Sequence, residues 1–477
     1  MHAPSEISVG RLRWLAAAAV LAALFAVGSP SRADDPKPSD PAPPGTAPAD
    51  PADDDGGAAA SLDSQVKTAI ERGIAWLKTQ QHADGWYGDI GTKVKAYDGV
   101  SIVYQHPSGP TAIALYAMLK CGVPAEDPVI RKGFEWLRKT TLKEARKAYE
   151  NSVLLLAITS TGDTFKKASE SRAAGDRVKL SADLKKWATD VKDALVGQRS
   201  PRGWRYEKNC KDPGGPEDVS STQLAILALH QAERCGIPVD PAVFTDAIQY
   251  VMTLQEKEGP EVDRAVIARP RPAAGAKPAA GSDPEKGRYA PPSGEAPPAK
   301  DHARGFQYAV HATAQEDEKR VSGSRTACGV GSLLIARYAL EARTGRESAN
   351  ALARLDRKAL EKAIYDGLAW LSVNFSTYSN PLYEIKQIYY LYSVERVMDL
   401  VGAARLGTHL WYSEMARELL THQDGKGFWD TKDAQVGARN PVVDTSLAIL
   451  FLHRATRGLL PVPALTSSGD APPTDNR

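Results

Sequence analysis

A short arrangement recurs four times along the chain and constrains its fold more than any other feature. Each copy has a glutamine, a polar break and a glycine followed by an aromatic residue: Gln80 with Gly85-Trp86, Gln198 with Gly203-Trp204, Gln255 with Gly305-Phe306, and Gln423 with Gly427-Phe428-Trp429. A longer match joins "ALYAMLKCGVPAEDP" at Ala114 to "ALHQAERCGIPVDP" at Ala228. In both, the glycine can cap a helix and the proline cannot continue it. Repeats of this kind bury their apolar faces against their neighbours.

Two kinds of helix are predicted to alternate. One kind carries a single apolar stripe, as in Val66, Ile70, Ile74 and Leu77, whereas segments such as "SVLLLAI" and "TSLAILFL" are apolar almost all round. A stripe indicates an outer helix, and all-round apolarity indicates a buried one. The outer helices are expected to begin near Asp63, Pro128, Ala182, Pro241, Asp356 and His409, and the inner ones near Gly109, Ala148, Asp218, Ser322, Leu382 and Asn440. Six such pairs predict an all-α fold, an (α/α)6 toroid.

The first 33 residues are typical of a secretory signal. Arg11 and Arg13 precede an apolar run from Trp14 to Val27, and Ser31-Arg32-Ala33 offers small residues for cleavage. The run is shorter than the roughly 20 residues that span a bilayer. We therefore expect an exported chain, in the periplasm, on the cell surface or secreted. An uncleaved N-terminal anchor is the alternative, and no transmembrane span is expected after signal removal.

Three further segments have the composition of disordered chain. Residues 34–60 are rich in Pro, Asp and Ala, residues 262–303 are rich in Pro, Ala and Gly, and residues 461–477 are polar. Such segments have little apolar surface to bury. The toroid is thus predicted to occupy residues 61–460, with a disordered arm before it, one disordered insert within it and a disordered tail.

Charge and cysteine content exclude several classes of function. The chain has 60 basic and 58 acidic residues, and the net charge is about zero without the signal. This balance argues against nucleic acid as a partner, because binding it requires clustered positive charge. Cys121, Cys210, Cys235 and Cys328 lie far apart and form no CxxC pair, so no zinc site is predicted. Export leaves a disulfide possible. No metal and no cofactor are expected.

The first copy of the repeat resembles a known motif. Arg72-Gly73, Trp76-Leu77, Gln80 and Gly85-Trp86 are similar to the QW motif of squalene and hopene cyclases and of protein prenyltransferase β subunits. The resemblance spans residues 63 to 457 and implies a toroid. It also implies that the glutamine caps neighbouring helix ends while the aromatic residue packs on it. The motif is thus expected to be structural.

The chemistry of those families is missing from the sequence. The cyclase Asp-x-Asp-Asp-Thr acid is reduced to Asp444-Thr445 in "PVVDTS", or to Asp218 and Thr222 in "DVSSTQ". The prenyltransferase Asp-x-Cys ligand pair is absent, because Thr326 stands two residues before Cys328. Complement-type thioester domains carry Cys-Gly-Glu-Gln, but Cys328 is followed by Gly329-Val330-Gly331.

Polar residues at the starts of the inner helices are the candidate site, because all six starts should meet at one mouth of the ring. The catalytic candidates are Asp444, Glu384 and Glu150, and the ligand-binding candidates are Arg325, Tyr383, Tyr389 and Asp218. Helix capping is the competing interpretation of the carboxylates. The predicted function is a non-cyclising toroid that binds a ligand, a terpenoid, lipid or glycan, in its central cavity. The alternatives are a divergent terpenoid cyclase that uses Asp444, or a carbohydrate-active glycosidase or lyase.

Overall fold

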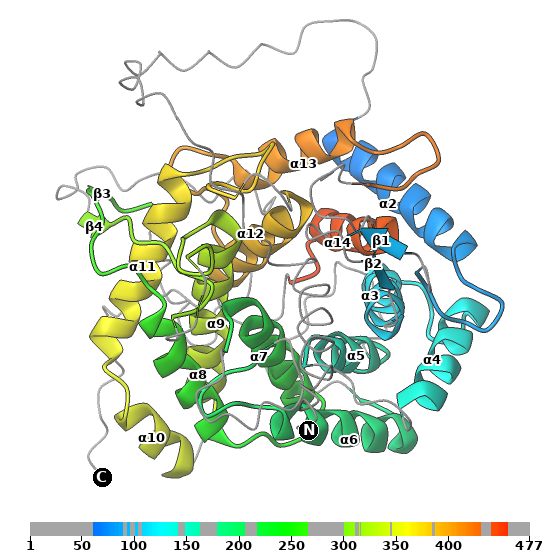
Figure 1. The fold of residues 1–477 in the computed structure, drawn as a ribbon, viewed down its shortest axis with the longest axis horizontal. Helices are drawn as coiled ribbons and strands as arrows, with labels where there is room; N and C mark the ends of the chain where they lie inside the picture. The colour runs from blue at the N-terminus through cyan, green and yellow to red at the C-terminus, as the bar shows by residue number, and fades with distance from the viewer. Residues whose placement is uncertain are drawn as a thin grey trace, which may run out of the picture.

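Two concentric rings of helices form the protein (Figure 1). The computed structural model describes residues 61–88, 93–95, 101–103, 107–141, 148–162, 179–205, 217–265, 300–310, 314, 316–343, 346–383, 387–430 and 440–456. The outer ring contains α2 (Leu62–Thr79), α4 (Pro128–Thr141), α6 (Ala182–Gly197), α8 (Pro241–Thr253), α11 (Arg357–Val373) and α13 (Trp411–Thr421). The inner ring contains α3 (Ser108–Lys120), α5 (Ala148–Ser160), α7 (Val219–Arg234), α9 (Gly323–Glu341), α12 (Gln387–Val401) and α14 (Pro441–His453). The predicted α/α toroid is confirmed.

Burial separates the two rings as the apolar patterns predicted. Every residue of α5 is buried, whereas α2 buries only Val66, Ala69, Gly73 and Leu77. Local signals fix the helix ends: Ser61 caps α2 by accepting from the Ser64 N–H at 3.3 Å, and Asp240 precedes the proline that opens α8. Each inner helix packs on the next, from α3 through α5, α7, α9, α12 and α14 back to α3, so the ring is closed.

Glutamine amides join neighbouring outer helices. Gln81 Nε2 donates to the Gly85 carbonyl at 3.0 Å and to the Val129 carbonyl of α4 at 2.8 Å. The Gln255 amide likewise donates to the Ala363 carbonyl of α11 at 2.9 Å. The residue that bridges in the first unit is therefore Gln81 and not Gln80, which caps the end of α2 and reaches only the Thr79 hydroxyl.

The aromatic residue of each unit is fixed to the following inner helix. The backbone N–H groups of Trp204, Phe306 and Trp429 donate to the hydroxyls of Thr222, Thr326 and Thr445 at 3.0, 3.1 and 3.0 Å respectively. In the first unit Tyr87 takes this place, with Thr111 as its acceptor at 2.9 Å. Trp86 stacks on the His82 ring at 3.6 Å and is only half-buried, so the expectation that Trp86 seals this seam is wrong by one residue.

Short elements interrupt the helical series that the sequence predicted to be free of strands. They are the helix α10 (Arg346–Ala353) and two antiparallel ribbons, β1 (Lys93–Lys95) with β2 (Ser101–Val103) and β3 (Glu261–Asp263) with β4 (Lys300–His302). The second ribbon lies at the two ends of the insert predicted at 262–303, and the described residues include four from each end of it, 262–265 and 300–303. Residues 266–299, the predicted signal and arm at 1–60, and the tail at 461–477 lie outside the described residues. Among the helices that are described, none has the length and apolarity to cross a membrane.

Candidate functional site

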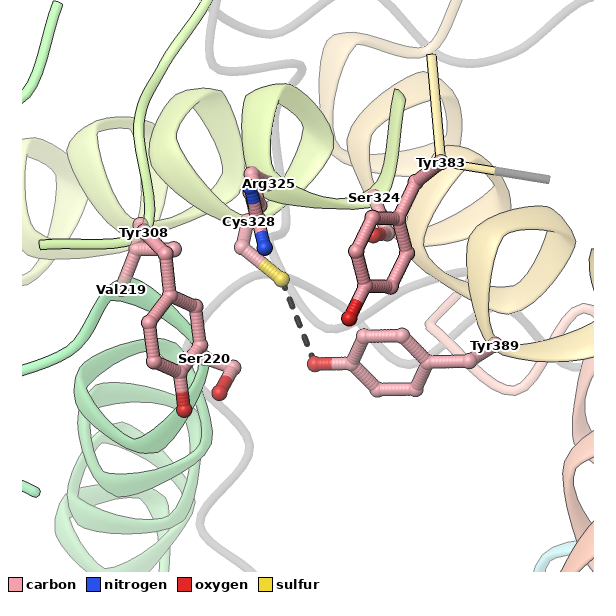
Figure 2. Close-up of a pocket in the computed structure, with 8 residues that line it drawn as sticks. All are labelled: Val219, Ser220, Tyr308, Ser324, Arg325, Cys328, Tyr383 and Tyr389. Carbon is pink, nitrogen blue, oxygen red and sulfur yellow. Dashed lines mark hydrogen bonds between the residues drawn. The ribbon is translucent and has the colours of Figure 1, made fainter. Parts of the chain in front are cut away.

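A pocket lies where the first turns of three neighbouring inner helices meet (Figure 2). Its lining comes from α7, α9 and α12 and from the segments before α9 and α12: Val219, Ser220, Tyr308, Ser324, Arg325, Cys328, Tyr383 and Tyr389. Helix N-termini carry partial positive charge and unpaired N–H groups. The pocket therefore lies at the electropositive end of three inner helices, with three tyrosine side chains around it.

The pocket is narrow in this conformation. It encloses about 290 Å³ free of protein atoms, including space open to solvent, but only about 10 Å³ of this can take the centre of a water molecule. The smaller figure decides what fits, and it corresponds to about one water. A larger ligand requires a lining side chain to move. Tyr383 is the half-buried member of the tyrosine trio, whereas Tyr308 and Tyr389 are buried.

Arg325 is held rigidly in the pocket wall. Its Nη1 donates to the carbonyls of Asp317 and Arg320 at 2.7 and 2.8 Å, and its Nη2 contacts the Asp317 carboxylate at 3.1 Å. The guanidinium carbon lies 4.7 Å from the centroid of the Tyr383 ring and 5.4 Å from that of Tyr308. Arg325 is thus placed between two aromatic rings with its charge already balanced by Asp317.

Asp218 lies beside the pocket and caps α7. Its carboxylate accepts from the Ser221 N–H and from the Ser220 hydroxyl, both at 2.7 Å. Burial raises the pKa of this carboxyl, while the donors on Ser221, Ser220 and Tyr308 oppose the rise. The capping interpretation therefore applies to Asp218, and the same contact holds the Ser220 hydroxyl against the pocket.

Cys328 and Tyr389 form the floor. The Cys328 Sγ lies 3.3 Å from the Tyr389 hydroxyl (Figure 2). The Ser393 hydroxyl lies 4.0 Å from the same sulfur. Burial raises the pKa of the Cys328 thiol and of the Tyr389 phenol, so both are neutral at pH 7. A neutral thiol is a poor nucleophile. The two groups offer hydrogen bonds rather than covalent chemistry.

The predicted carboxylates do not gather in this pocket. Glu150 is buried in the first turn of α5, beside Gly109 at the start of α3. Asp444 is half-buried in the first turn of α14, whose cap is Asn440. Neither residue is among the pocket lining, whereas the predicted Arg325, Tyr383 and Tyr389 are. Glu384 lies outside the described residues.

Some residues of the site were not predicted. Tyr308 follows the Gly305-Phe306 turn, and Cys328 stands one turn below Arg325 on α9, a spacing that the sequence does contain. Two other tyrosines of α12 are buried away from the lining: Tyr390 packs on Gly323, and Tyr392 lies under the guanidinium of Arg396. No cluster of three His, Cys, Asp or Glu side chains within the described ranges could hold a metal ion.

Comparison with known proteins gives no family. No protein-family profile matches the chain, and no curated protein matches its sequence. Similar solved structures include a variant of the type II terpene cyclase MstE from Scytonema in complex with geranylgeranyl dihydroxybenzoate, at 11% identity and a TM-score of 0.44, covering 83% of this chain and 98% of that one.

Two other similar structures are carbohydrate-active by name. An inactive variant of the alpha-1,6-mannanase of Salegentibacter sp. HEL1_6 in complex with alpha-1,6-mannotriose has 9% identity and a TM-score of 0.45, covering 82% of this chain and 98% of that one. An unsaturated glucuronyl hydrolase specific for heparin has 9% identity and a TM-score of 0.45, covering 83% of this chain and 96% of that one. At such scores none of these likenesses assigns an activity.

Proposed function

We propose that this chain is an exported, non-cyclising toroid that binds the end of a glycan in the pocket at the start of α7, α9 and α12. The observation that carries the proposal is the lining itself. Three tyrosine side chains surround hydroxyl and guanidinium groups from Ser220, Ser324 and Arg325. Aromatic faces pack on the apolar faces of sugar rings, and fixed donors and acceptors match sugar hydroxyls.

The same lining argues against a terpenoid cyclase. A cyclisation site needs an apolar cavity large enough for the folded substrate, and it needs a strong acid pointing into it. Asp444, the acid that the sequence offered, is not part of the lining.

The carboxylates near the pocket indicate a binding function rather than a hydrolytic one. A glycosidase uses two carboxyl groups roughly 5–10 Å apart, one as acid and one as base or nucleophile. Near the described lining, Asp218 is engaged as a helix cap and Asp317 as the partner of Arg325. Each already has a structural role, so neither is poised to transfer a proton.

The test is an oligosaccharide screen by isothermal titration, with chromatography of the mixtures after long incubation. We expect at least one glycan to bind without being cleaved. Replacing Tyr383 by Ala should weaken binding at least tenfold, because one aromatic platform is lost. The matched control is Tyr378→Ala, since that ring is 76% exposed and lies outside the lining. Equal loss in both variants, or shortened products, would contradict the proposal.

A further inference from the structure

A buried arginine lies beneath the pocket floor. Arg396 follows Tyr389 by seven residues on α12, about two turns. The two residues therefore share a face of the helix, and helical side chains lean toward the N-terminus, which is the pocket end. Arg396 is 0% exposed and ranks among the largest fully buried side chains of the protein. No motif in the sequence analysis pointed to it.

Gln223 and Tyr392 are the partners that the described residues give this guanidinium. Nη1 donates to the Gln223 side-chain oxygen of α7, and the guanidinium carbon lies 4.4 Å from the centroid of the Tyr392 ring. Gly331 of α9 makes room for that glutamine, since a Cβ at this position would lie 2.7 Å from Gln223 Nε2. Nε and Nη2 of Arg396 have no hydrogen-bond partner among the described residues.

No carboxylate among the described residues forms an ion pair with Arg396. Burial raises the pKa of the phenols of Tyr116, Tyr149 and Tyr392, so all three are neutral at pH 7. Burial also raises the pKa of Glu395, the adjacent residue, and Asp399 raises it further. A guanidinium does not lose its proton in a protein. A fully buried charge without an anionic partner is strongly unfavourable, so the open donors of Arg396 favour an anion.

Two other arginines of the chain show what the free edge accepts. Arg264 binds the Asp301 carboxylate through Nε at 3.0 Å and Nη2 at 2.9 Å. Arg454 binds Asp399 through the same two nitrogens, with Nε at 3.0 Å. In both cases the Nε and Nη2 edge forms the paired contact with a planar carboxylate. We infer that the Nε and Nη2 edge of Arg396 binds the carboxylate group of a small ligand that enters the ring through the pocket.

The path from the pocket to Arg396 runs past Cys328 and Tyr389. Both residues line the pocket. Both also lie close enough to Arg396 that its positive charge offsets part of the rise in pKa that burial causes. The 3.3 Å contact between the thiol and the phenol closes this path. The inference is independent of the proposed glycan function, because it concerns a deeper group and a different ligand chemistry.

Equilibrium dialysis of labelled formate and acetate against the full chain tests the inference directly. We expect one tight site per chain in the wild type, and none in Arg396→Met. The matched control is Arg264→Met, which removes an arginine that already has its carboxylate, and this variant should keep the site. Arg396→Lys retains the charge without the paired donors and should bind at least tenfold more weakly. If Arg396→Met does not fold, the weaker binding by Arg396→Lys and the stoichiometry of the wild type still test whether the site exists.

A thermal-shift series at constant ionic strength separates a carboxylate from any small anion. Replacing chloride by formate or acetate should raise the Tm of the wild type by about 2 °C for each tenfold increase above the dissociation constant. Arg396→Met should show no such rise. An equal rise with chloride, or no dialysable site in the wild type, would overturn the inference. Glycan binding is measured separately from carboxylate binding. A protein without a carboxylate site at Arg396 can still bind a glycan, and a protein that binds no glycan can still have the carboxylate site.

Discussion

The Gln423 amide closes the ring by donating to the Ala69 carbonyl of α2 at 2.9 Å, across 354 residues of sequence. It also donates to the Gly427 carbonyl at 2.8 Å. One side chain therefore satisfies a carbonyl in its own turn and another in the first helix of the series. Gln81 and Gln255 make the equivalent pair of contacts at their own seams.

Removing a bridging amide should weaken the ring. We expect Gln423→Ala and Gln81→Ala each to lower the free energy of unfolding by about 1–3 kcal/mol, because each removes two hydrogen bonds worth roughly 0.5–1.5 kcal/mol apiece. Gln80→Ala is the matched control, since the Gln80 amide reaches only the Thr79 hydroxyl, and should change stability by less than about 0.5 kcal/mol. Urea titration measures all three. If Gln80→Ala costs as much as Gln81→Ala, the one-residue correction to the first seam is wrong.

Loss of a seam aromatic should depend on which residue is buried. Trp204 is fully buried and its indole N–H donates to the Leu195 carbonyl at 2.8 Å, so Trp204→Ala should cost about 3–5 kcal/mol. Trp86 is half-buried, so Trp86→Ala should cost clearly less than Tyr87→Ala, whose ring is fully buried. Denaturant titration of the three variants checks the order. A larger loss for Trp86 than for Tyr87 would show that the seam is packed differently.

Acid should destabilise the protein in part through His453. Burial, with a smaller effect of Lys120, lowers its pKa from 6.5 to about 4. Between these values the unfolded chain takes up a proton that the folded chain does not, so stability falls as pH falls from about 6.5 to about 4. The full effect is about 3 kcal/mol, because one pKa unit corresponds to about 1.4 kcal/mol. His453→Gln should remove this part of the pH dependence. If the free energy of unfolding falls equally in the wild type and in His453→Gln from pH 7 to pH 4, His453 is not the source of this pH dependence.

The insert should be removable only up to its ribbon. Replacing residues 266–299 by an Asn-Gly turn retains β3 and β4 and should leave the Tm nearly unchanged, because loop length costs little closure entropy. A deletion of 261–303 removes the His302 N–H that donates to the fully buried Asp366 carboxylate at 2.9 Å, and should cost about 1–3 kcal/mol. Calorimetry compares the two deletions. A cooperative transition of equal Tm in both would show that the ribbon adds nothing.

Export is a prediction from residues 1–33 alone. In a host that secretes the protein, the mature chain should begin near Asp34, because Ser31-Arg32-Ala33 has the small residues that a signal peptidase cleaves after. N-terminal sequencing of the purified protein decides the question. An intact Arg11 would instead support the uncleaved anchor.

The helical pairs were predictable from sequence because apolar periodicity is a local property. Inner helices such as α5 and α14 were recognised by their lack of a polar face, and most helix starts fell within two residues of the expected ones. The start of α12 was placed too early: the chain from Asn380 to Tyr383 makes a turn, with Leu382 at a φ of 60°, and α12 begins at Gln387.

The site was less predictable because its contacts are distant in sequence. Gln223 and Arg396 are 173 residues apart, and the local sequence around either residue does not predict their contact. Thr222 and Thr445 are also polar residues at inner-helix starts, but their hydroxyls accept backbone N–H groups from buried aromatic residues. Polarity at a helix start does not reveal whether a side chain turns toward a cavity or toward its own seam.

Closure of the ring fixes the number of units. In an open stack of hairpins the two end units each have one bare face, and adding a unit merely moves an end. Here α14 packs on both α2 and α3, so every hairpin has two neighbours and no terminal unit needs a polar outer surface. A duplicated seventh hairpin would have to change the angle at every seam at once. Variation among such chains is therefore expected in their connecting segments rather than in their length by whole units, and the residues 266–299 between β3 and β4 are one such place.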